Sequence, residues 1–435
     1  MTEKEIVKQI IVSRQEQFPI DRILDREVLL PIKSGKIISV PGVRRCGKSS
    51  LLMLTVNKLL SEGVDRKKIL YFNFDDERLL FDENNLDTII AAYRELYPYI
   101  DIHEVYMFFD EIQMAEGWER FIRRIYEQVC SNIFITGSNS KMLSSEIATA
   151  LRGRSLQYEE FPLSFAEACR FKGLDTSIYS ESSQAKIIAL FNQYIHWGGF
   201  PEVIMADETL RERILNEYFY VMLYKDFIER YNINPAKTAK YYIQRVMENI
   251  TKPTSINKIY NELKSQGVSI SKDKVYSLAE HCESIYLFLP LRKYSRSILK
   301  TSTSDTKYYC IDCGLRTITM KPHNDDNGKL LENAVFLHLH RNLSPGENLT
   351  YYNGKNECDF VVESFGEVSH LIQVSWDISN EETLRREVAG LKECASATGC
   401  DDMTIITSSE EDYIADEEKH IKVIPAWKWM LQGKQ

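Results

Sequence analysis

Apolar and polar residues alternate along the first 160 residues in a pattern that predicts strands joined by helices. Apolar runs that we expect to be strands lie at 36–40, 69–74, 105–109, 132–136 and 155–158. Helical spacing of apolar residues precedes or separates them at 3–17, 49–60, 86–97 and 118–128. Strands apolar on both faces that alternate with helices are typical of a parallel sheet. The pattern therefore predicts an α/β fold with functional residues at the carboxyl ends of its strands.

The segment after the first expected strand has the sequence of a phosphate-binding loop. Residues 42–49 read GVRRCGKS, which fits G-x-x-x-x-G-K-[ST]. Glycines let backbone N–H groups surround a polyphosphate, and the following helix adds partial positive charge. Lys48 is expected to reach the β- and γ-phosphates, and the Ser49 hydroxyl to bind Mg²⁺. The residues that we predict to bind ATP are Gly42, Arg44, Arg45, Cys46, Gly47, Lys48, Ser49 and Ser50. The two loop arginines are equally compatible with simple solvation.

An acidic pair follows the strand expected at 105–109. Asp110 and Glu111 come directly after the apolar run, about sixty residues beyond the phosphate-binding loop. In a Mg²⁺-dependent ATPase an aspartate at this place holds the metal, and the next glutamate polarises the attacking water. A solvated acidic turn at the end of a strand is the alternative interpretation. We predict that Asp110 is a metal ligand and that Glu111 is catalytic.

Two later segments are candidates for sensing or stabilising the γ-phosphate. Ser138 and Asn139 follow the strand at 132–136, where a polar side chain would lie beside that phosphate. Arg154, or else Arg152, precedes the strand at 155–158 and is a candidate arginine finger, acting on its own or on a neighbouring subunit. An ordinary loop and a surface arginine are the alternatives. A finger acting between subunits would require a homo-oligomer, for which the sequence has no signature of its own.

Composition restricts the class of protein. The chain has 435 residues, of which 44% are hydrophobic and 27% charged, so two to four soluble domains are expected. No apolar run approaches the length of a membrane span, and the polar N-terminus does not resemble a signal peptide, so we expect a cytoplasmic protein. Nine scattered cysteines are then expected to be reduced. Cys310 and Cys313 form a C-x-x-C without a second pair, which does not predict zinc binding.

A helix–turn–helix pattern begins near residue 235. Ser255 precedes a helical run at 256–264, residues 265–267 form a glycine-containing turn, and a second helix is expected at 272–282. Strands are expected at 285–291 and 307–311, with a serine- and threonine-rich segment between them. This arrangement predicts a winged helix, which presents a recognition helix to DNA.

Charge supports a DNA interface in this segment. The whole chain carries a net charge of −9, which argues against a protein coated in nucleic acid. Residues 250–310 nevertheless contain ten lysines and arginines against five acids, a local net charge of +5. Arg292, Lys293 and Arg296 surround Tyr294 in the expected wing and are candidate phosphate contacts. Winged helices also bind other proteins, so a protein partner is the alternative.

These motifs together resemble a known family. The chain is similar to the prokaryotic AAA-superfamily ATPases that carry a C-terminal restriction-endonuclease-like domain of unknown function. The resemblance rests on residues 42–49, FDEIQ at 109–113 with Trp118-Glu119, TGS at 136–138 and LRGR at 151–154. It continues through PLSFAE at 162–167, YIHWGGFPEV at 194–203 and Lys225-Asp226.

The resemblance implies four domains. It implies an ASCE-type P-loop core at 1–165, a helical lid at 166–234, a winged helix at 235–320 and a restriction-endonuclease-like domain of PD-(D/E)xK type at 321–435. The cofactors implied are ATP and Mg²⁺. The family has no settled biological role, so the resemblance does not identify a pathway.

The tail lacks part of the catalytic set that nucleases of this fold use. Such nucleases need a helix glutamate, an aspartate at a strand end and then E-x-K on the next strand, where the carboxylates bind Mg²⁺ and the lysine helps to activate water. Glu332 and Asp359 correspond to the first two. Gln373 stands where the acid belongs and Ser375 where the lysine belongs. We therefore expect the fold to be kept and cleavage to be lost.

The sequence favours an ATPase whose nucleotide state controls how the winged helix and the tail engage DNA. A nucleotide-dependent signalling switch that binds proteins through the same parts is one alternative. An active metal-dependent nuclease with an unorthodox site is another.

Overall fold

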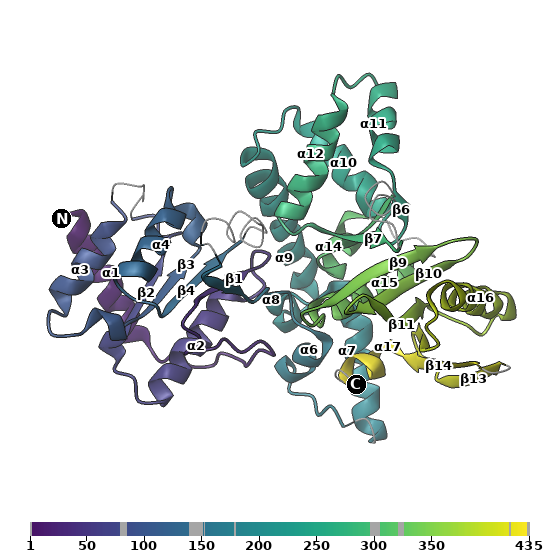
Figure 1. The fold of residues 1–435 in the computed structure, drawn as a ribbon, viewed down its shortest axis with the longest axis horizontal. Coiled ribbons are helices and arrows are strands. Elements are labelled where there is room, and N and C mark those ends of the chain that lie inside the picture. Colours follow the sequence, from purple (N-terminus) through teal and green to yellow (C-terminus); the bar gives the residue numbers. More distant parts are fainter. Residues whose placement is uncertain are drawn as a thin grey trace. The chain divides into compact units, whose positions relative to one another are not determined.

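The chain folds into two units, residues 1–161 and 162–435, in the computed structural model of the protein (Figure 1). The structure describes residues 2–78, 85–138, 151, 153–177, 180–295, 305–320, 326–416 and 419–432. Asn139, Arg152 and Arg296 therefore lie outside the described residues. In the described part of the chain, no helix is both long and apolar enough to cross a membrane.

The first unit alternates strands with helices. Its α-helices are α1 (Glu3–Gln17), α2 (Lys48–Ser61), α3 (Asp87–Leu96) and α4 (Trp118–Gln128). Its strands are β1 (Ile37–Pro41), β2 (Ile69–Asn73), β3 (Tyr106–Asp110), β4 (Ile133–Gly137) and β5 (Ser155–Gln157). Short 3₁₀ turns lie at Arg66–Lys68, Ile102–Glu104 and Ile112–Met114. The strands expected from the sequence are confirmed to within about one residue at each end.

The five described strands form a parallel sheet in the order β2-β3-β4-β1-β5. Alternate strand residues point to opposite faces, so Ile37 and Phe109 pack with α1, α3 and α4, whereas Ile38 and Phe108 pack with α2. In Figure 1, α4 and α2 lie on opposite sides of these strands. Both faces are apolar because helices cover both, as the sequence pattern predicted.

The parallel arrangement places the carboxyl ends of β1, β3 and β4 at one edge of this sheet. The phosphate-binding loop follows β1, Asp110 ends β3, and Gly137 ends β4. Since β4 lies between β1 and β3, residues from all three strands converge there.

The second unit begins with helices and ends with a mixed sheet. Its helices are α6 (Phe165–Phe171), α7 (Glu181–Trp197), α8 (Pro201–Met205), α9 (Glu208–Val221), the π-helix η5 (Met222–Glu229), α10 (Ala236–Glu248), α11 (Ile256–Ser265), α12 (Lys272–Ser284), α14 (Cys313–Thr319), α15 (Asp326–Arg341), α16 (Glu381–Thr398) and α17 (Ala426–Leu431). Its strands are β6 (Pro253–Thr254), β7 (Phe288–Lys293), β8 (Thr306–Cys310), β9 (Glu347–Asn353), β10 (Glu357–Ser364), β11 (Glu367–Val374), β12 (Met403–Thr407), β13 (Asp412–Asp416) and β14 (Lys419–Pro425).

One continuous sheet of nine described strands runs through this unit. Its order is β13-β14-β12-β11-β10-β9-β7-β8-β6. The hairpin β7-β8 joins the C-terminal strands because β7 pairs in parallel with β9, through Arg292 opposite Thr350 and Lys293 opposite Tyr351. A boundary at residue 320, expected from the sequence, therefore falls within one hydrogen-bonded sheet. The division into four domains remains a prediction.

The helix–turn–helix expected from the sequence corresponds to α11 and α12. The strand expected at 285–291 begins later, at Phe288, because α12 continues to Ser284 and Tyr286 then takes a left-handed conformation with φ of 63°. A chain that turns in this way cannot enter the strand at once. β7 also ends two residues later than expected, at Lys293, and the order of these two helices and two strands is unchanged.

Candidate nucleotide-binding site

The loop between β1 and α2 has the conformation that its glycines permit. Gly47 is the N-cap of α2 and has a φ of 115°, which a side chain rarely tolerates. A Cβ atom on Gly42 would lie 2.2 Å from the Glu160 carbonyl oxygen, so only glycine fits there. The first turn of α2 therefore starts at Lys48 and points its backbone N–H groups into the loop. This is the geometry of an anion-binding helix start.

Lys48 is the buried cation of this loop. Its side chain is 3% exposed, and its ammonium group donates a hydrogen bond of 3.1 Å to the Val43 carbonyl oxygen. The same nitrogen lies 3.4 Å from a carboxylate oxygen of Glu111. Burial would raise the pKa of Glu111, but the charges of Lys48 and Arg44 and a hydrogen bond from Gln113 outweigh it and lower that pKa. Glu111 is thus held ionised next to the place expected for the γ-phosphate.

Asp110 is fixed by hydroxyl groups from the neighbouring strands. It is 1% exposed and accepts hydrogen bonds from the Tyr71 hydroxyl at 2.7 Å and the Thr136 hydroxyl at 2.5 Å. Thr136 also accepts a bond of 2.9 Å from the Glu111 backbone N–H, and Glu111 has a left-handed φ of 51°. Non-glycine residues in this conformation cluster at functional sites. The turn after β3 therefore aims the two carboxylates in different directions.

The oxygen donors at this edge fit Mg²⁺, which prefers hard ligands and commonly completes its shell with water and phosphate oxygens. Each carboxylate oxygen of Asp110 accepts one hydroxyl and keeps a further lone pair. Ser49 lies in the first turn of α2, on the element that carries Lys48. Across the described ranges, no three acidic, histidine or cysteine side chains are grouped so as to hold a metal by themselves. Mg²⁺ would therefore need water or phosphate oxygens as additional ligands.

Gln113 links the candidate catalytic residues. Its amide nitrogen donates to Glu111 at 2.6 Å and lies 3.3 Å from the Ser138 hydroxyl, which is itself buried. The structure thus brings Ser138 to the same edge as Glu111, as the sequence predicted. The sequence analysis predicted no role for Gln113 or Thr136, although Gln113 lies in the FDEIQ motif and Thr136 in the TGS motif. Those two motifs were the available signal.

The other loop residues differ in position. Ser49 and Ser50 are half-buried in the first turn of α2, and Arg44 is half-buried near Glu111. Arg45 is exposed, with a φ of 65°. The Cys46 thiol donates to the Glu160 carbonyl oxygen at 3.3 Å, and burial raises its pKa to about 11. Cys46 therefore stays protonated and anchors the loop through its side chain, leaving only its backbone to face a phosphate.

Arg26 supports the loop from within the unit, and sequence reasoning missed it. Its guanidinium donates to the carbonyl oxygens of Cys46 at 2.7 Å and Phe161 at 2.9 Å, and it forms a buried ion pair with Glu160. A Cβ atom on Gly47 would lie 2.6 Å from the same guanidinium. In the sequence, Arg26 stands between Asp25 and Glu27 and looks like an exposed residue, so no pattern signalled its burial.

Arg154 does not lie beside its own phosphate-binding loop. Its carbonyl oxygen accepts a bond from the N–H of Ile37, the first residue of β1, whereas the loop follows the last. The length of β1 separates them, about 13 Å at the usual rise per residue. The Arg154 guanidinium pairs instead with Glu127 of α4 at 2.8 Å. If Arg154 is a finger, it acts on a neighbouring subunit.

Comparison with known proteins identifies the first unit. A family model described as an AAA domain matches residues 34–169, and a domain of unknown function, DUF8612, matches residues 188–325. The uncharacterized protein MJ1544 of Methanocaldococcus jannaschii is 35% identical over 99% of this chain and 96% of its own length. This chain belongs to the same family of AAA-domain proteins. An uncharacterized protein of Haemophilus influenzae is 30% identical over 91% of the chain and 94% of its own length.

Solved structures resemble this chain only loosely. The Walker-type ATPase PABY2304 of Pyrococcus abyssi is 15% identical, covers 73% of this chain and 96% of its own, and has a TM-score of 0.40. The ORC1 protein of Aeropyrum pernix, solved in complex with DNA, is 13% identical over 73% of this chain and 92% of its own, with a TM-score of 0.30. At these TM-scores the likeness carries no argument about what this chain binds.

The basic residues expected in the wing lie partly within the large sheet. Arg292 is exposed and Lys293 is half-buried at the end of β7, and the N–H of Tyr294 donates to the Tyr351 carbonyl oxygen at 2.7 Å. The last residues of β7 are therefore strand residues bound to β9. The backbone at this end of β7 pairs with β9, so the exposed Arg292 side chain extends from a hydrogen-bonded strand.

A second charged cluster lies in the C-terminal unit. The Lys307 ammonium group on β8 contacts Glu332 of α15 at 3.2 Å, Asp359 of β10 at 3.2 Å and Glu357 at 2.5 Å. The Tyr309 hydroxyl donates to Glu332 at 2.7 Å. Glu332 and Asp359 are together, as the sequence predicted, but Lys307 was missed because it comes from a strand outside the expected motif.

Gln373 and Ser375, which the sequence analysis aligned with E-x-K, differ in their contacts. Gln373 is buried beside Asp359: its side-chain oxygen accepts from the Asp359 N–H at 3.1 Å, and its nitrogen donates to Glu387 at 2.6 Å. The Ser375 hydroxyl turns away and donates to the Asp377 carbonyl oxygen at 3.2 Å. A serine at this position therefore contributes no charge to the cluster.

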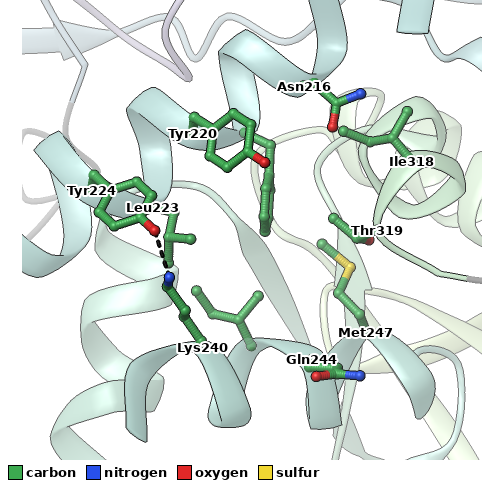
Figure 2. Close-up of a pocket in the computed structure, with 11 residues that line it drawn as sticks. Asn216, Tyr220, Leu223, Tyr224, Lys240, Gln244, Met247, Ile318 and Thr319 are labelled. Carbon is green, nitrogen blue, oxygen red and sulfur yellow. Dashed lines mark hydrogen bonds between the residues drawn. The ribbon is translucent and has the colours of Figure 1, made fainter. Parts of the chain in front are cut away.

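A pocket of about 280 Å³ lies among α9, η5, α10 and α14 (Figure 2). Figure 2 shows apolar side chains such as Leu223 and Met247 facing its interior and Asn216 and Gln244 at its margin. Lys240 donates to the Tyr224 hydroxyl at 2.5 Å. The π-helix turns widely here, and an apolar interior with a few polar groups is typical of small-molecule pockets. The sequence did not predict this pocket.

Proposed function

We propose that this chain is an ATP-hydrolysing AAA-type P-loop ATPase. The observation that carries the proposal is the convergence of Lys48, Glu111 and Asp110 at one edge of a parallel sheet, with the Lys48 ammonium group 3.4 Å from Glu111. Lys48 and the first N–H groups of α2 would bind the phosphates. Ser49 and Asp110 would hold Mg²⁺, which neutralises phosphate charge when bound. Glu111, held ionised by its neighbours, would orient and polarise the attacking water.

Lys48→Ala is expected to abolish ATP turnover and to weaken ATP binding strongly. The variant removes the buried cation that is expected to contact the β- and γ-phosphates. The measurement is phosphate release under excess ATP, together with binding of a fluorescent ATP analogue. Lys58→Ala, an exposed substitution on the same helix, is the matched control and should behave like the wild type. Normal ATP turnover by Lys48→Ala would contradict the assignment of Lys48 as the phosphate-binding lysine.

We further propose that the nucleotide state is coupled to DNA binding through a winged helix formed around α11 and α12. Lys272, Lys274 and Tyr276 are exposed on the N-terminal half of α12, the part of a recognition helix that usually faces bases. The Lys272 ammonium group lies 5.7 Å from the centre of the Tyr276 ring. Arg292 adds an exposed cation on β7. The tail would act as a degenerate nuclease-like domain.

DNA binding is expected to weaken steeply with salt, because cations that contact phosphates displace condensed counterions. Charge reversal at Lys272, Lys274 and Arg292 should lower affinity and reduce the slope of log K against log salt by about 1 for each lost contact. Fluorescence anisotropy with a duplex oligonucleotide measures both quantities, with and without ATP.

Lys186→Glu, an exposed charge reversal on α7, is the control for a general effect of net charge. A response to salt that is the same in the triple variant and the wild type would count against this interface. If ATP changes the particle mass while DNA binds to neither protein, the signalling-switch alternative takes precedence.

A further inference from the structure

Three carboxylates surround the ammonium group of Lys307. Its side chain is fully buried, and its nitrogen lies within 3.2 Å of Glu332, Glu357 and Asp359. An ammonium group has three N–H donors, and here three carboxylates are available to accept them. The Tyr351 ring lies on another side, with its centre 5.3 Å from the nitrogen. Burial alone would lower the pKa of Lys307, but the surrounding carboxylates raise it well above its usual value.

The same lysine could instead be a displaced catalytic lysine beside a metal ion, and the geometry does not fit that interpretation. A catalytic lysine must reach an attacking water, whereas this side chain is fully enclosed. A divalent cation placed among the same oxygens would lie within a few ångströms of the ammonium charge and be repelled by it.

The remaining polar groups of the cluster are also engaged. The second carboxylate oxygen of Asp359 accepts a bond of 3.0 Å from the Val374 N–H. Gln373 directs its nitrogen toward Glu387, whose other oxygen pairs with Arg386 at 2.6 Å. Among the described residues no three acidic, histidine or cysteine side chains are grouped to hold a metal, and around Lys307 the three carboxylates are each directed at its nitrogen instead. The residues present therefore do not fit the divalent ion that a nuclease-like fold implies.

We infer that the Lys307 ammonium group is the permanent cation of this cluster and takes the place of a divalent metal ion. The cluster then needs no metal, and it ties β8 to α15 and β10 as one electrostatic unit. The inference rests on the part of the proposed function that treats the tail as a degenerate nuclease-like domain. It is independent of ATP hydrolysis, because it concerns none of the residues at the phosphate-binding loop.

Binding of Mn²⁺ to the full chain tests this inference. All proteins carry Asp110→Asn, which removes the metal ligand expected at the nucleotide site, and they are measured without nucleotide by electron paramagnetic resonance. The parent is expected to bind no Mn²⁺ in the tail. Lys307→Met removes the charge at similar length and should create one Mn²⁺ site, which Asp359→Asn in the same chain should abolish. Lys307→Arg keeps the charge and should bind none.

Three results would overturn the inference. The first is Mn²⁺ binding by the parent that Asp359→Asn removes, and the second is a folded Lys307→Met variant that binds no Mn²⁺. The third is metal-dependent cleavage of plasmid DNA by the wild-type chain that Asp359→Asn removes. If Lys307→Met does not fold, thermal unfolding of the parent decides between the outcomes. Equal unfolding midpoints in Mn²⁺ and in chelator support the inference. A midpoint that Mn²⁺ raises, and that Asp359→Asn returns to its value in chelator, contradicts it. Turnover of wild-type ATPase is measured in parallel, so failure of either proposal is seen separately.

Discussion

Glu111→Gln is expected to lower ATP turnover by about 10²–10⁴-fold while ATP binding stays within a few-fold of the wild type. Glutamine keeps the size of the side chain but cannot polarise a water molecule as an ionised carboxylate does. Binding persists because Lys48, Ser49 and the start of α2 are unchanged. Single-turnover hydrolysis of radiolabelled ATP measures the rate of hydrolysis, and equilibrium binding measures the affinity for ATP.

Glu116→Gln is the matched control, since Glu116 is exposed and close in sequence. It should hydrolyse ATP at the wild-type rate. Full turnover by Glu111→Gln would show that another group orients the water, and Gln113, 2.6 Å from Glu111, would be the next residue to test. Loss of binding together with turnover would instead point to damage to the loop.

Arg26→Met is expected to destabilise the first unit by about 3–5 kcal/mol, because it removes the guanidinium that pairs with the buried Glu160 carboxylate. For a unit of this size that corresponds to a fall in Tm of roughly 10 °C. ATP affinity should fall as well, since the Cys46 carbonyl oxygen loses the 2.7 Å hydrogen bond that holds the loop. Differential scanning fluorimetry and ATP binding measure the two effects.

The double variant Arg26→Met with Glu160→Met separates these two roles. Replacing both members of a buried ion pair by apolar residues is often neutral, so most of the stability should return. ATP affinity should remain low, because the carbonyl oxygen still lacks a donor. Arg94→Met, on the exposed side of α3, is the control and should alter neither quantity. An unchanged Tm in Arg26→Met would contradict the role assigned to this pair.

The parallel sheet and most of the nucleotide site were predictable because their signals are local. Apolar runs mark strands that helices cover on both sides, and the spacing of Gly42, Gly47 and Lys48 is imposed by the backbone of a single loop. Asp110 and Glu111 were predictable for a related reason: polar residues directly after a buried strand must lie at its carboxyl end. The order of the strands then brings them to the loop.

Residues that act from a distance in sequence could not be predicted. Arg26 reaches the loop across twenty residues and pairs with Glu160, far along the chain. A short charged segment such as Asp25-Arg26-Glu27 has the same pattern whether it is buried or solvated. The candidate finger Arg154 illustrates the reverse case, because its motif was recognisable while its position at the opposite edge of the sheet depends on strand direction.

The tail gives the clearest example of what the tertiary structure decided. Along the strand at 371–375, Gln373 and Ser375 stand where E-x-K would place an acid and a lysine, so the sequence indicated that both were missing. The fold places Lys307 of β8 against Glu332 and Asp359, and the pairing of β7 with β9 joins this hairpin to the C-terminal strands.

The sequence by itself therefore determined the phosphate-binding loop, the acidic pair after β3 and the α/β class of the first unit. These follow from short-range rules on backbone conformation and on the burial of apolar strands. Only the tertiary structure decided which ionic partners share a buried site, namely Arg26 with Glu160 and Lys307 with its carboxylates. The physical reason is that a buried charge is stable only beside a partner, and nothing in local sequence records which distant residue the fold will place there.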